Sequence, residues 1–198
     1  MNVAVIESCG ANFKSVLNAL DRLNLNYKLT IDKTIIQQAD VVLLPGVGSA
    51  GFAMNKLNNN GLTDVICQLK QPVLGICLGM QLLYEYSVED NVPCLGIIPG
   101  RLNKFPDNMN LIIPHMGWNN LIFDVNHPLF ADIKLNNDVY FVHSYYAPIN
   151  EYTLASCNYG VDFTAIVNYA NFYGMQFHPE KSSEVGAKLL ANFFRLVK

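Results

Sequence analysis

The sequence predicts an α/β fold: one domain over residues 1–198, with a doubly wound, mostly parallel (mixed) central sheet and helices on both of its faces. Three observations lead to this prediction. In the first half of the chain, short apolar runs alternate with segments of helical periodicity. One of these runs ends in a Gly-x-Cys-x-Gly turn that leads into a helical pattern. Hydrophobic residues make up 51% of the chain and charged residues 15%, which suits a large sheet that is buried on both faces.

The elements of the first half alternate between strand and helix. Strands are expected at 2–6, 27–31, 41–44 and 73–76, the third of which is expected to stop at Pro45. Helices are expected after the first strand, with Asn12 or Ser15 as the N-cap, and at 50–57, 62–69 and 78–87.

The second half has a different pattern, because Asn, Asp and Gly divide it into short strand-like runs. Strands are expected at 95–98, 111–113, 139–142, 152–157, 164–167 and 172–177. We expect the first five of these runs to lie as antiparallel strands and loops on one edge of the main sheet, and 172–177 to form another strand. A last helix is expected to begin at Ser182 or Ser183.

Composition excludes several classes of protein. The net charge is −3, so no basic surface argues for nucleic acid. No apolar stretch reaches the length of a membrane-spanning helix, and the N-terminus lacks the charged region of a secretory signal. The five cysteines have no metal-ligand spacing, so they are expected to be free thiols in a reducing cytoplasm. No metal or other cofactor is expected.

The turn around Cys77 is the clearest chemical signal in the sequence. Cys77 ends an apolar run and precedes a helical pattern, and Gly75 and Gly79 allow a close approach of the backbone on either side. This is the arrangement of a nucleophile elbow with Cys in place of Ser. The helix N-terminus favours the thiolate, and the N–H of Leu78 can face an oxyanion. A lone cysteine in an apolar run is more often a buried structural residue, but the glycine frame favours the nucleophile.

His178 is the expected base for this thiol. It follows an apolar strand, and Pro179 stiffens the turn behind it. In an extended chain, residues 178 and 180 point to the same side, so Glu180 can hold the imidazole ring. The alternative is a histidine that ends a strand and packs under the last helix.

The glycine-rich turn Pro45-Gly46-Val47-Gly48 is the expected third part of the site. Its glycines leave backbone N–H groups able to turn into a cavity, so Val47 is a candidate oxyanion donor that faces Leu78. An ordinary strand-to-helix turn is the alternative. No Lys-Ser/Thr pair follows, which excludes a nucleotide P-loop.

Together these segments resemble a known family. Gly75–Gln81 with Gln176–Glu180 is similar to the triad (class I) glutamine amidotransferases. Pro45–Gly48, Pro114–Asn119 and Phe141–Tyr145 resemble, more narrowly, the glutaminase subunits of imidazole glycerol phosphate synthases in histidine biosynthesis. The resemblance runs from the first strand to the last helix.

The resemblance implies roles for particular residues. Cys77 would be the nucleophile, His178 the general base and acid, and Glu180 the orienting carboxylate, acting on L-glutamine without a cofactor. The implied substrate-binding residues are Gly46, Gly48, Gln81, Glu89, Ser144 and Tyr145. Of these, Gln81 would hydrogen-bond glutamine, Glu89 would pair with its α-ammonium, and the backbone of Ser144 and Tyr145 would hold its α-carboxylate. From the residues alone, Gln81 and Glu89 could equally be solvated surface side chains.

The resemblance also implies a partner, a (β/α)₈ cyclase subunit that forms a heterodimer with this chain and uses the ammonia. The residues expected to face it are Asn12, Trp118 and Lys181. The alternatives are an ordinary buried aromatic for Trp118 and a solvated lysine for Lys181. The segment Glu7–Asn12 departs from the Asp-Tyr-Gly-x-Gly-Asn of many members, which affects a loop that faces the partner in the family.

Three other functions stay open at this point, the third being a non-enzymatic binding subunit with a vestigial site, against which the intact Cys77, His178 and Glu180 argue. The same glutaminase chemistry could serve another synthase, for example one that amidinates a sugar. A cysteine hydrolase of similar fold is the second, although such an enzyme would not need Gln81 or the segment around Trp118.

Overall fold

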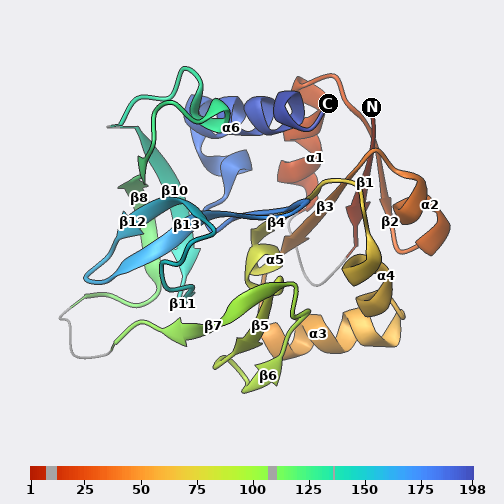
Figure 1. The fold of residues 1–198 in the computed structure, drawn as a ribbon, viewed down its shortest axis with the longest axis horizontal. Helices are drawn as coiled ribbons and strands as arrows, with labels where there is room; N and C mark the ends of the chain where they lie inside the picture. The colour runs from red at the N-terminus through yellow and green to blue at the C-terminus, as the bar shows by residue number, and fades with distance from the viewer. Residues whose placement is uncertain (8–12, 107–110, 136) are drawn as a thin grey trace.

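A mixed sheet forms the centre of the computed structural model, which describes residues 1–7, 13–106, 111–135 and 137–198. Its parallel strands are β1 (Asn2–Ile6), β2 (Asn26–Thr30), β3 (Val41–Gly46), β4 (Val73–Cys77) and β14 (Phe172–Met175). Its antiparallel strands are β9 (Ile122–Phe123), β12 (Thr153–Asn158) and β13 (Asp162–Tyr169). Within the described residues, the order is β2-β1-β3-β4-β14-β13-β12-β9 (Figure 1). The predicted mostly parallel, mixed sheet is confirmed.

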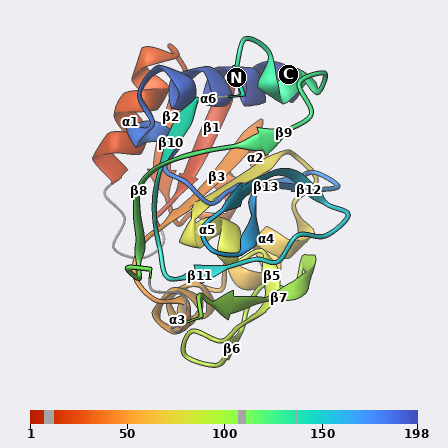
Figure 2. The same cartoon turned by 90° about the vertical axis from the view of Figure 1, so that its left-hand side faces the viewer.

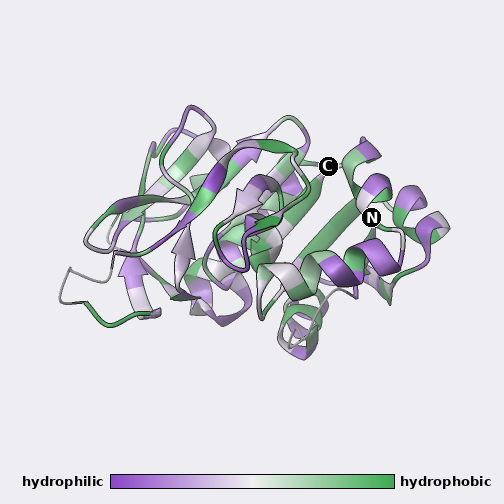
Figure 3. Ribbon diagram, turned by 90° about the horizontal axis from the view of Figure 1, so that it is seen from below, coloured by the Kyte–Doolittle hydropathy of each residue, from purple (hydrophilic) through white to green (hydrophobic). Residues whose placement is uncertain are grey.

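Helices cover both faces of this sheet. One face carries α1 (Phe13–Arg22) and α6 (Ser183–Leu196), and the other carries α2 (Lys33–Gln38), α3 (Ala50–Asn59) and α4 (Thr63–Gln68) (Figure 1). Successive side chains of a strand point to opposite faces, so a strand between two helix layers must be apolar throughout. In β1, Val3 and Val5 belong to the first core, and Ala4 and Ile6 belong to the second. The hydrophobic colour of the central strands in Figure 3 reflects this burial on both faces.

Two smaller sheets complete the fold of the described residues. One pairs β8 (His115–Asn120) with β10 (Asp138–His143). The other contains β5 (Tyr84–Ser87), β6 (Val92–Pro93), β7 (Ile98–Lys104) and β11 (Tyr145–Tyr146). The chain passes from β10 through Ser144 directly into β11, which lies beside β7 (Figure 2). The short 3₁₀ helices η1 (Pro128–Phe130) and η2 (Pro179–Lys181) lie before β10 and α6.

The prediction of a helix at 78–87 is correct for the first turn and wrong beyond it. α5 covers only Leu78–Gln81, and the chain then becomes the strand β5. The carbonyl of Leu82 accepts from Leu95 N–H, and that of Leu83 accepts from Ile98 N–H, both at 2.8–2.9 Å. Partners far along the chain thus take the carbonyls that a longer helix would use, and Glu89 lies in a turn rather than near a helix end.

Other boundaries also differ from expectation. The strand expected at 95–98 is wrong, because the chain is irregular until β7 begins at Ile98. The strand expected at 111–113 is also irregular chain, and β8, which begins at His115, was not predicted. β3 continues through Pro45 to Gly46, and β14 ends at Met175 rather than at residue 177. Ser15 lies inside α1, so it is not the N-cap, and Asn12 lies outside the described residues. The start of the last helix is confirmed, with Ser182 at the N-cap position.

Candidate active site

The backbone at Cys77 makes the sharp turn that an elbow requires. Cys77 ends β4 with φ +54° and ψ −113°, a conformation that non-glycine residues rarely adopt. Such a backbone costs about 1–3 kcal/mol and persists only where its surroundings enforce it. A Cβ at Gly79 would lie 1.6 Å from the carbonyl oxygen of Leu44, and one at Gly75 would lie 2.6 Å from the backbone of Gly79. α5 can therefore pack directly against the strands only because both positions are glycine.

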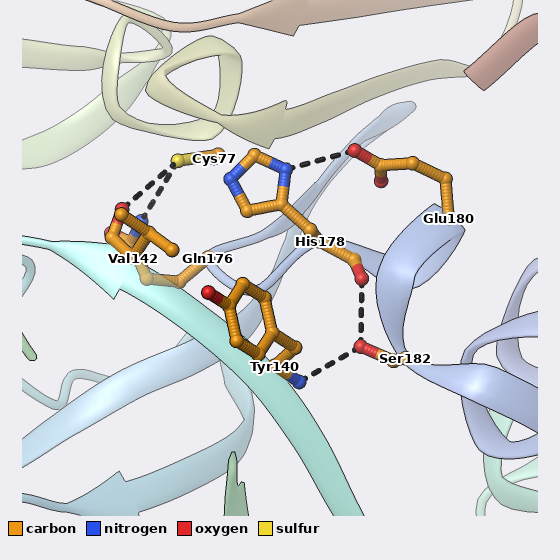
Figure 4. Close-up of polar contacts among 7 residues, drawn as sticks. All are labelled: Cys77, Tyr140, Val142, Gln176, His178, Glu180 and Ser182. Carbon is orange, nitrogen blue, oxygen red and sulfur yellow. Dashed lines mark hydrogen bonds and ion pairs between the residues drawn. The ribbon is translucent and has the colours of Figure 1, made fainter. Parts of the chain in front are cut away.

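The imidazole of His178 lies between Cys77 and the Glu180 carboxylate (Figure 4). Its Nδ1–H donates to Glu180 Oε1 at 2.9 Å, and both side chains are buried. The predicted contact is present, although residues 179–181 form the 3₁₀ helix η2 and not the extended chain that we expected. Glu180 Oε2 is also buried and has no hydrogen-bond partner within the described part of the chain.

These neighbours decide the protonation of His178. Burial alone lowers its pKa, but hydrogen bonds to Cys77 and Glu180 and the negative charges of both groups raise the pKa to about 10. The imidazole is therefore protonated at neutral pH. α5 has a single turn, so its dipole is small, and this imidazolium adds a positive charge beside the sulfur.

Two residues that the sequence did not predict as site residues hold Cys77 and His178 in place. Ser182 Oγ donates to the carbonyl of His178 at 2.7 Å and accepts from Tyr140 N–H at 2.9 Å, which ties η2 to β10 (Figure 4). Gln176 Nε2 donates to Cys77 Sγ at 3.9 Å, and the thiol is 3.7 Å from the carbonyl of Val142. Ser182 was expected only as a helix cap.

A cavity of about 350 Å³ opens beside the sulfur, large enough for an amino acid. It is lined by Val47, Gly48, Cys77, Leu78, Gln81, Glu89, Pro114, Val142, His143, Ser144, Tyr145, His178 and Lys181. The structure thus brings together most of the site residues that the sequence pointed to. Three lining residues were not expected: Pro114, Val142 and His143.

The two expected oxyanion donors border this cavity. Leu78 is the first residue of α5, so its N–H has no acceptor within the helix. Val47 and Gly48 follow β3 and line the same cavity as Cys77. Gly46 pairs with Cys77 in the β3–β4 ladder and does not line the cavity.

Polar groups surround the rest of the cavity. Gln81 Nε2 donates to the carbonyl of Tyr145 at 3.0 Å and to Gln176 Oε1 at 2.9 Å. Glu89 Oε2 accepts from Ala50 N–H at 2.9 Å. Burial raises the pKa of Glu89, and the charge of Asp90 adds to this, while the Ala50 hydrogen bond opposes it. A carboxylate in this position would gain from a cationic ligand.

The expected partner-facing residues occupy different places. Lys181 is exposed and lines the cavity mouth. Trp118 is 53% exposed on β8, so it is neither in a loop nor an ordinary buried aromatic. Asn12 lies outside the described residues. The described residues contain no group of three or more His, Cys, Asp or Glu side chains that could hold a metal ion.

Comparison with known proteins supports what the geometry indicates. Residues 4–197 match the family described as "Glutamine amidotransferase class-I". The chain belongs to the class-I glutamine amidotransferase family. As a member of this family, it is an enzyme with glutaminase activity.

The relatives narrow this assignment. The chain is 52% identical over 194 residues to imidazole glycerol phosphate synthase subunit HisH 2 of Legionella pneumophila (strain Paris), covering 98% of each chain. It is 49% identical over 197 residues to the HisH subunit of Haemophilus influenzae (strain ATCC 51907 / DSM 11121 / KW20 / Rd), covering 100% of this chain and 98% of that protein. These similarities confirm the resemblance to the glutaminase subunits.

Solved structures agree in fold. One described as a glutamine amidotransferase has a TM-score of 0.76 at 19% identity and covers 98% of both chains. Another, described as a putative GMP synthase protein from Thermoplasma acidophilum, has a TM-score of 0.74 at 18% identity and covers 100% of this chain and 94% of that one.

Proposed function

We propose that this chain is the glutaminase subunit of an imidazole glycerol phosphate synthase and hydrolyses L-glutamine to glutamate and ammonia. The observation that carries the proposal is a buried Cys77–His178–Glu180 arrangement on the wall of an amino-acid-sized cavity. The strong identity to HisH subunits along the whole chain supports the choice of synthase.

The reaction begins with Cys77 as the nucleophile. Its thiolate attacks the side-chain amide carbon of glutamine, and a carbon–sulfur bond forms while the carbonyl oxygen becomes an oxyanion. The N–H groups of Leu78 and Val47 stabilise this charge; one such donor is worth roughly a hundred- to a thousandfold in rate. His178 then gives its proton to the nitrogen as the carbon–nitrogen bond breaks, which releases ammonia and leaves a thioester.

Hydrolysis of the thioester returns the enzyme to its starting state. The neutral imidazole of His178 takes a proton from water as the water oxygen attacks the thioester carbon. The new intermediate expels the Cys77 thiolate, and glutamate leaves. Glu180 keeps the ring oriented in both steps and stabilises its charged form.

The α-carbon end of the substrate is bound by Glu89 and by the Ser144–Tyr145 bend, which line the same cavity as Cys77. The carboxylate of Glu89 pairs with the α-ammonium, and the backbone N–H groups at Ser144 and Tyr145 hold the α-carboxylate. Gln81 hydrogen-bonds the substrate. Gly46 and Gly48 give the oxyanion loop its shape, and Gly48 does so with φ +98°.

The ammonia passes to a (β/α)₈ cyclase subunit, because ammonia lost to bulk water would be protonated and wasted. The exposed apolar side chains of β8, Met116 (62% exposed) and Trp118, support a docking surface beside the cavity mouth. We assign Trp118 and Lys181 to this heterodimer interface, together with Asn12. No helix of the described residues is long and apolar enough to cross a membrane. The described cysteines are free thiols, in keeping with a cytoplasmic enzyme.

The test is glutamine-dependent and ammonium-dependent product formation by the complex with the cyclase. Cys77→Ala should abolish the first and leave the second intact, because the cyclase needs only free ammonia. Cys67→Ala, which removes an exposed free thiol, is the matched control and should retain both activities. Glutamine-dependent activity that persists in Cys77→Ala would refute the proposed nucleophile, and glutaminase activity that is stimulated only by another synthase would refute the choice of partner.

A further inference from the structure

A second pair of buried histidines adjoins the cavity, and the glutaminase chemistry does not use it. His143 ends β10 and lines the cavity, and His115 begins β8 directly opposite it in the β8–β10 ladder. Their exposed fractions are 5% and 3%. His143 Nε2 is 3.1 Å from His115 Nδ1, and His143 Nδ1 is 2.9 Å from the carbonyl oxygen of Tyr145.

The protons of this pair can be arranged in one way only. A carbonyl oxygen can only accept, so His143 Nδ1 must carry the hydrogen that points to Tyr145. A neutral imidazole carries a single N–H, so His143 Nε2 accepts, and His115 Nδ1 must donate to it. His115 Nε2 is then an acceptor, and Asn119 Nδ2 lies 3.4 Å from it. Asn119 uses the same amide nitrogen to donate to the carbonyl of Asn158 at 2.9 Å.

The surroundings keep both rings neutral and fixed. His115 is stacked between Tyr159, with ring centroids 3.9 Å apart, and Phe141, at 4.8 Å. Burial lowers the pKa of His143 to about 3, with a further contribution from the charge of His178 nearby, and burial lowers the pKa of His115 to about 4. A neutral Nδ1–H tautomer of both residues therefore persists across the physiological range of pH.

The carbonyl of Tyr145 is bonded from two sides. It accepts from His143 Nδ1 and, at 3.0 Å, from Gln81 Nε2, so both of its lone pairs are used. The preceding carbonyl, that of Ser144, accepts from Phe105 N–H at 3.1 Å. In a trans peptide, the C=O and the following N–H point in opposite directions. The bond from Phe105 to the Ser144 carbonyl therefore fixes the N–H of Tyr145. The bond from the His143 ring to the Tyr145 carbonyl spans Ser144, so it restrains the backbone of the bend that carries the Ser144 N–H.

We propose that His143 and His115 are positioning residues for the substrate carboxylate: His115 holds the ring of His143, and His143 holds the Ser144–Tyr145 bend so that its backbone N–H groups face the cavity. This inference rests on the proposed function, because it assumes that glutamine binds with its α-carboxylate at that bend. A hydrophobic side chain at position 143 could fill the same space, but it could not donate to the carbonyl of Tyr145.

The first experiment measures the tautomers directly. Long-range ¹H–¹⁵N NMR spectra of the full-length chain should show His115 and His143 as neutral Nδ1–H tautomers at pH 7. An Nε2–H tautomer or a protonated ring at either residue would overturn the proposal, whether or not the chain hydrolyses glutamine.

The second experiment separates carboxylate binding from thiol reactivity. The probe is 6-diazo-5-oxo-L-norleucine, a glutamine analogue that retains the α-carboxylate and alkylates the thiol; it is compared with iodoacetamide, which has no carboxylate. Both are applied to the complex with the cyclase, and alkylation of Cys77 is followed by mass spectrometry. His143→Leu should raise the half-saturating concentration of the analogue roughly five- to thirtyfold, as expected for a lost buried hydrogen bond. The rate with iodoacetamide should stay within about twofold.

Matched variants keep this test decisive. His143→Asn retains an N–H donor near the position of Nδ1 and should restore most of the binding that His143→Leu loses. His115→Phe keeps the aromatic stack and should give an intermediate effect. His127→Asn, a change at the remote cap of η1, should have none.

Three outcomes count against the inference. Analogue binding that is unchanged in folded His143→Leu would overturn it, as would equal losses with both reagents, which indicate a merely structural role. Failure of His143→Asn to restore binding would overturn the donor role. If the wild-type chain itself does not react with the analogue, the proposed function is wrong. The tautomer measurement then still tests the hydrogen-bond arrangement of His115 and His143.

Discussion

Replacing His115 with Phe should make the protein less sensitive to acid. Burial lowers the pKa of His115 to about 4, whereas a histidine in the unfolded chain titrates near ~6.5. Below that pH the unfolded chain binds a proton that the folded chain excludes, so the free energy of unfolding falls as the pH falls. Phe can keep the stack with Tyr159 and Phe141 but cannot take up a proton.

The expected size follows from the width of this pH window. pH 5 lies about 1.5 units below the pKa of a histidine in the unfolded chain, and each unit is worth about 1.4 kcal/mol. His115 therefore lowers the free energy of unfolding at pH 5 by about 2 kcal/mol. His143, whose pKa burial lowers to about 3, adds a loss of the same sign to both proteins. His178, whose pKa is raised to about 10, contributes with the opposite sign above ~pH 6.5. It does so in both proteins, so the comparison removes it.

The assay is urea unfolding at pH 7 and pH 5, followed by circular dichroism and by the fluorescence of Trp118. Coincident transitions by the two probes are required for a two-state analysis. Between these pH values, the wild type should lose about 2 kcal/mol more than His115→Phe. Equal losses in the two proteins would show that the folded state does not exclude a proton from His115, and the reasoning would be wrong.

Three further predictions concern the catalytic side of the cavity. Glu180→Gln should slow glutamine hydrolysis less than His178→Ala, because the proton transfer is worth roughly a hundred- to ten-thousandfold; equal losses at unchanged glutamine binding would give Glu180 a larger role. Asp90→Ala should lower the free energy of unfolding by about 1 kcal/mol in urea titrations, because Asp90 Oδ2 accepts from Gly51 N–H at 3.0 Å at the start of α3, where Ser49 makes no side-chain cap; an unchanged midpoint would contradict this. The purified chain alone should hydrolyse glutamine far more slowly than the complex with cyclase and its nucleotide substrate, because the glycine-flanked Val47 peptide need not face the cavity at rest; a full rate without the partner would refute this gating.

Local chemistry made the catalytic side predictable. The elbow is encoded within a few residues, because Gly75 and Gly79 are needed for the close packing around Cys77. The contact between His178 and Glu180 spans two residues and was likewise readable, although a 3₁₀ turn makes it. In both cases the interacting groups are neighbours in sequence, so little else in the fold has to be known.

The missed elements depend on distant partners. Beyond Gln81 the helical pattern of the sequence continues. The N–H groups of Leu95 and Ile98 nevertheless bond the carbonyls that follow Gln81, and the chain forms the strand β5 instead. β8 was missed because its pattern is reversed: Met116 and Trp118 point outward, whereas His115 is buried. A strand with its apolar side chains exposed looks like a loop in sequence, and a partner that covers them would explain the reversal.

The cavity lies where two differently built parts of the chain meet. The parallel sheet and α5 supply Val47, Cys77 and Leu78, and the β10–β11 bend supplies another wall. The carbonyl of Tyr145 is bonded from both parts, by Gln81 of α5 and by His143 of β10. A glutamine that reaches from Cys77 to this bend needs the two walls at a fixed separation. The bond from Gln81 joins the two walls, and the bond from His143, which lies on the same wall as Tyr145, holds the carbonyl that Gln81 needs as its acceptor. On this proposal an apolar side chain of the same size at position 143 could not replace the imidazole, because it has no N–H to donate.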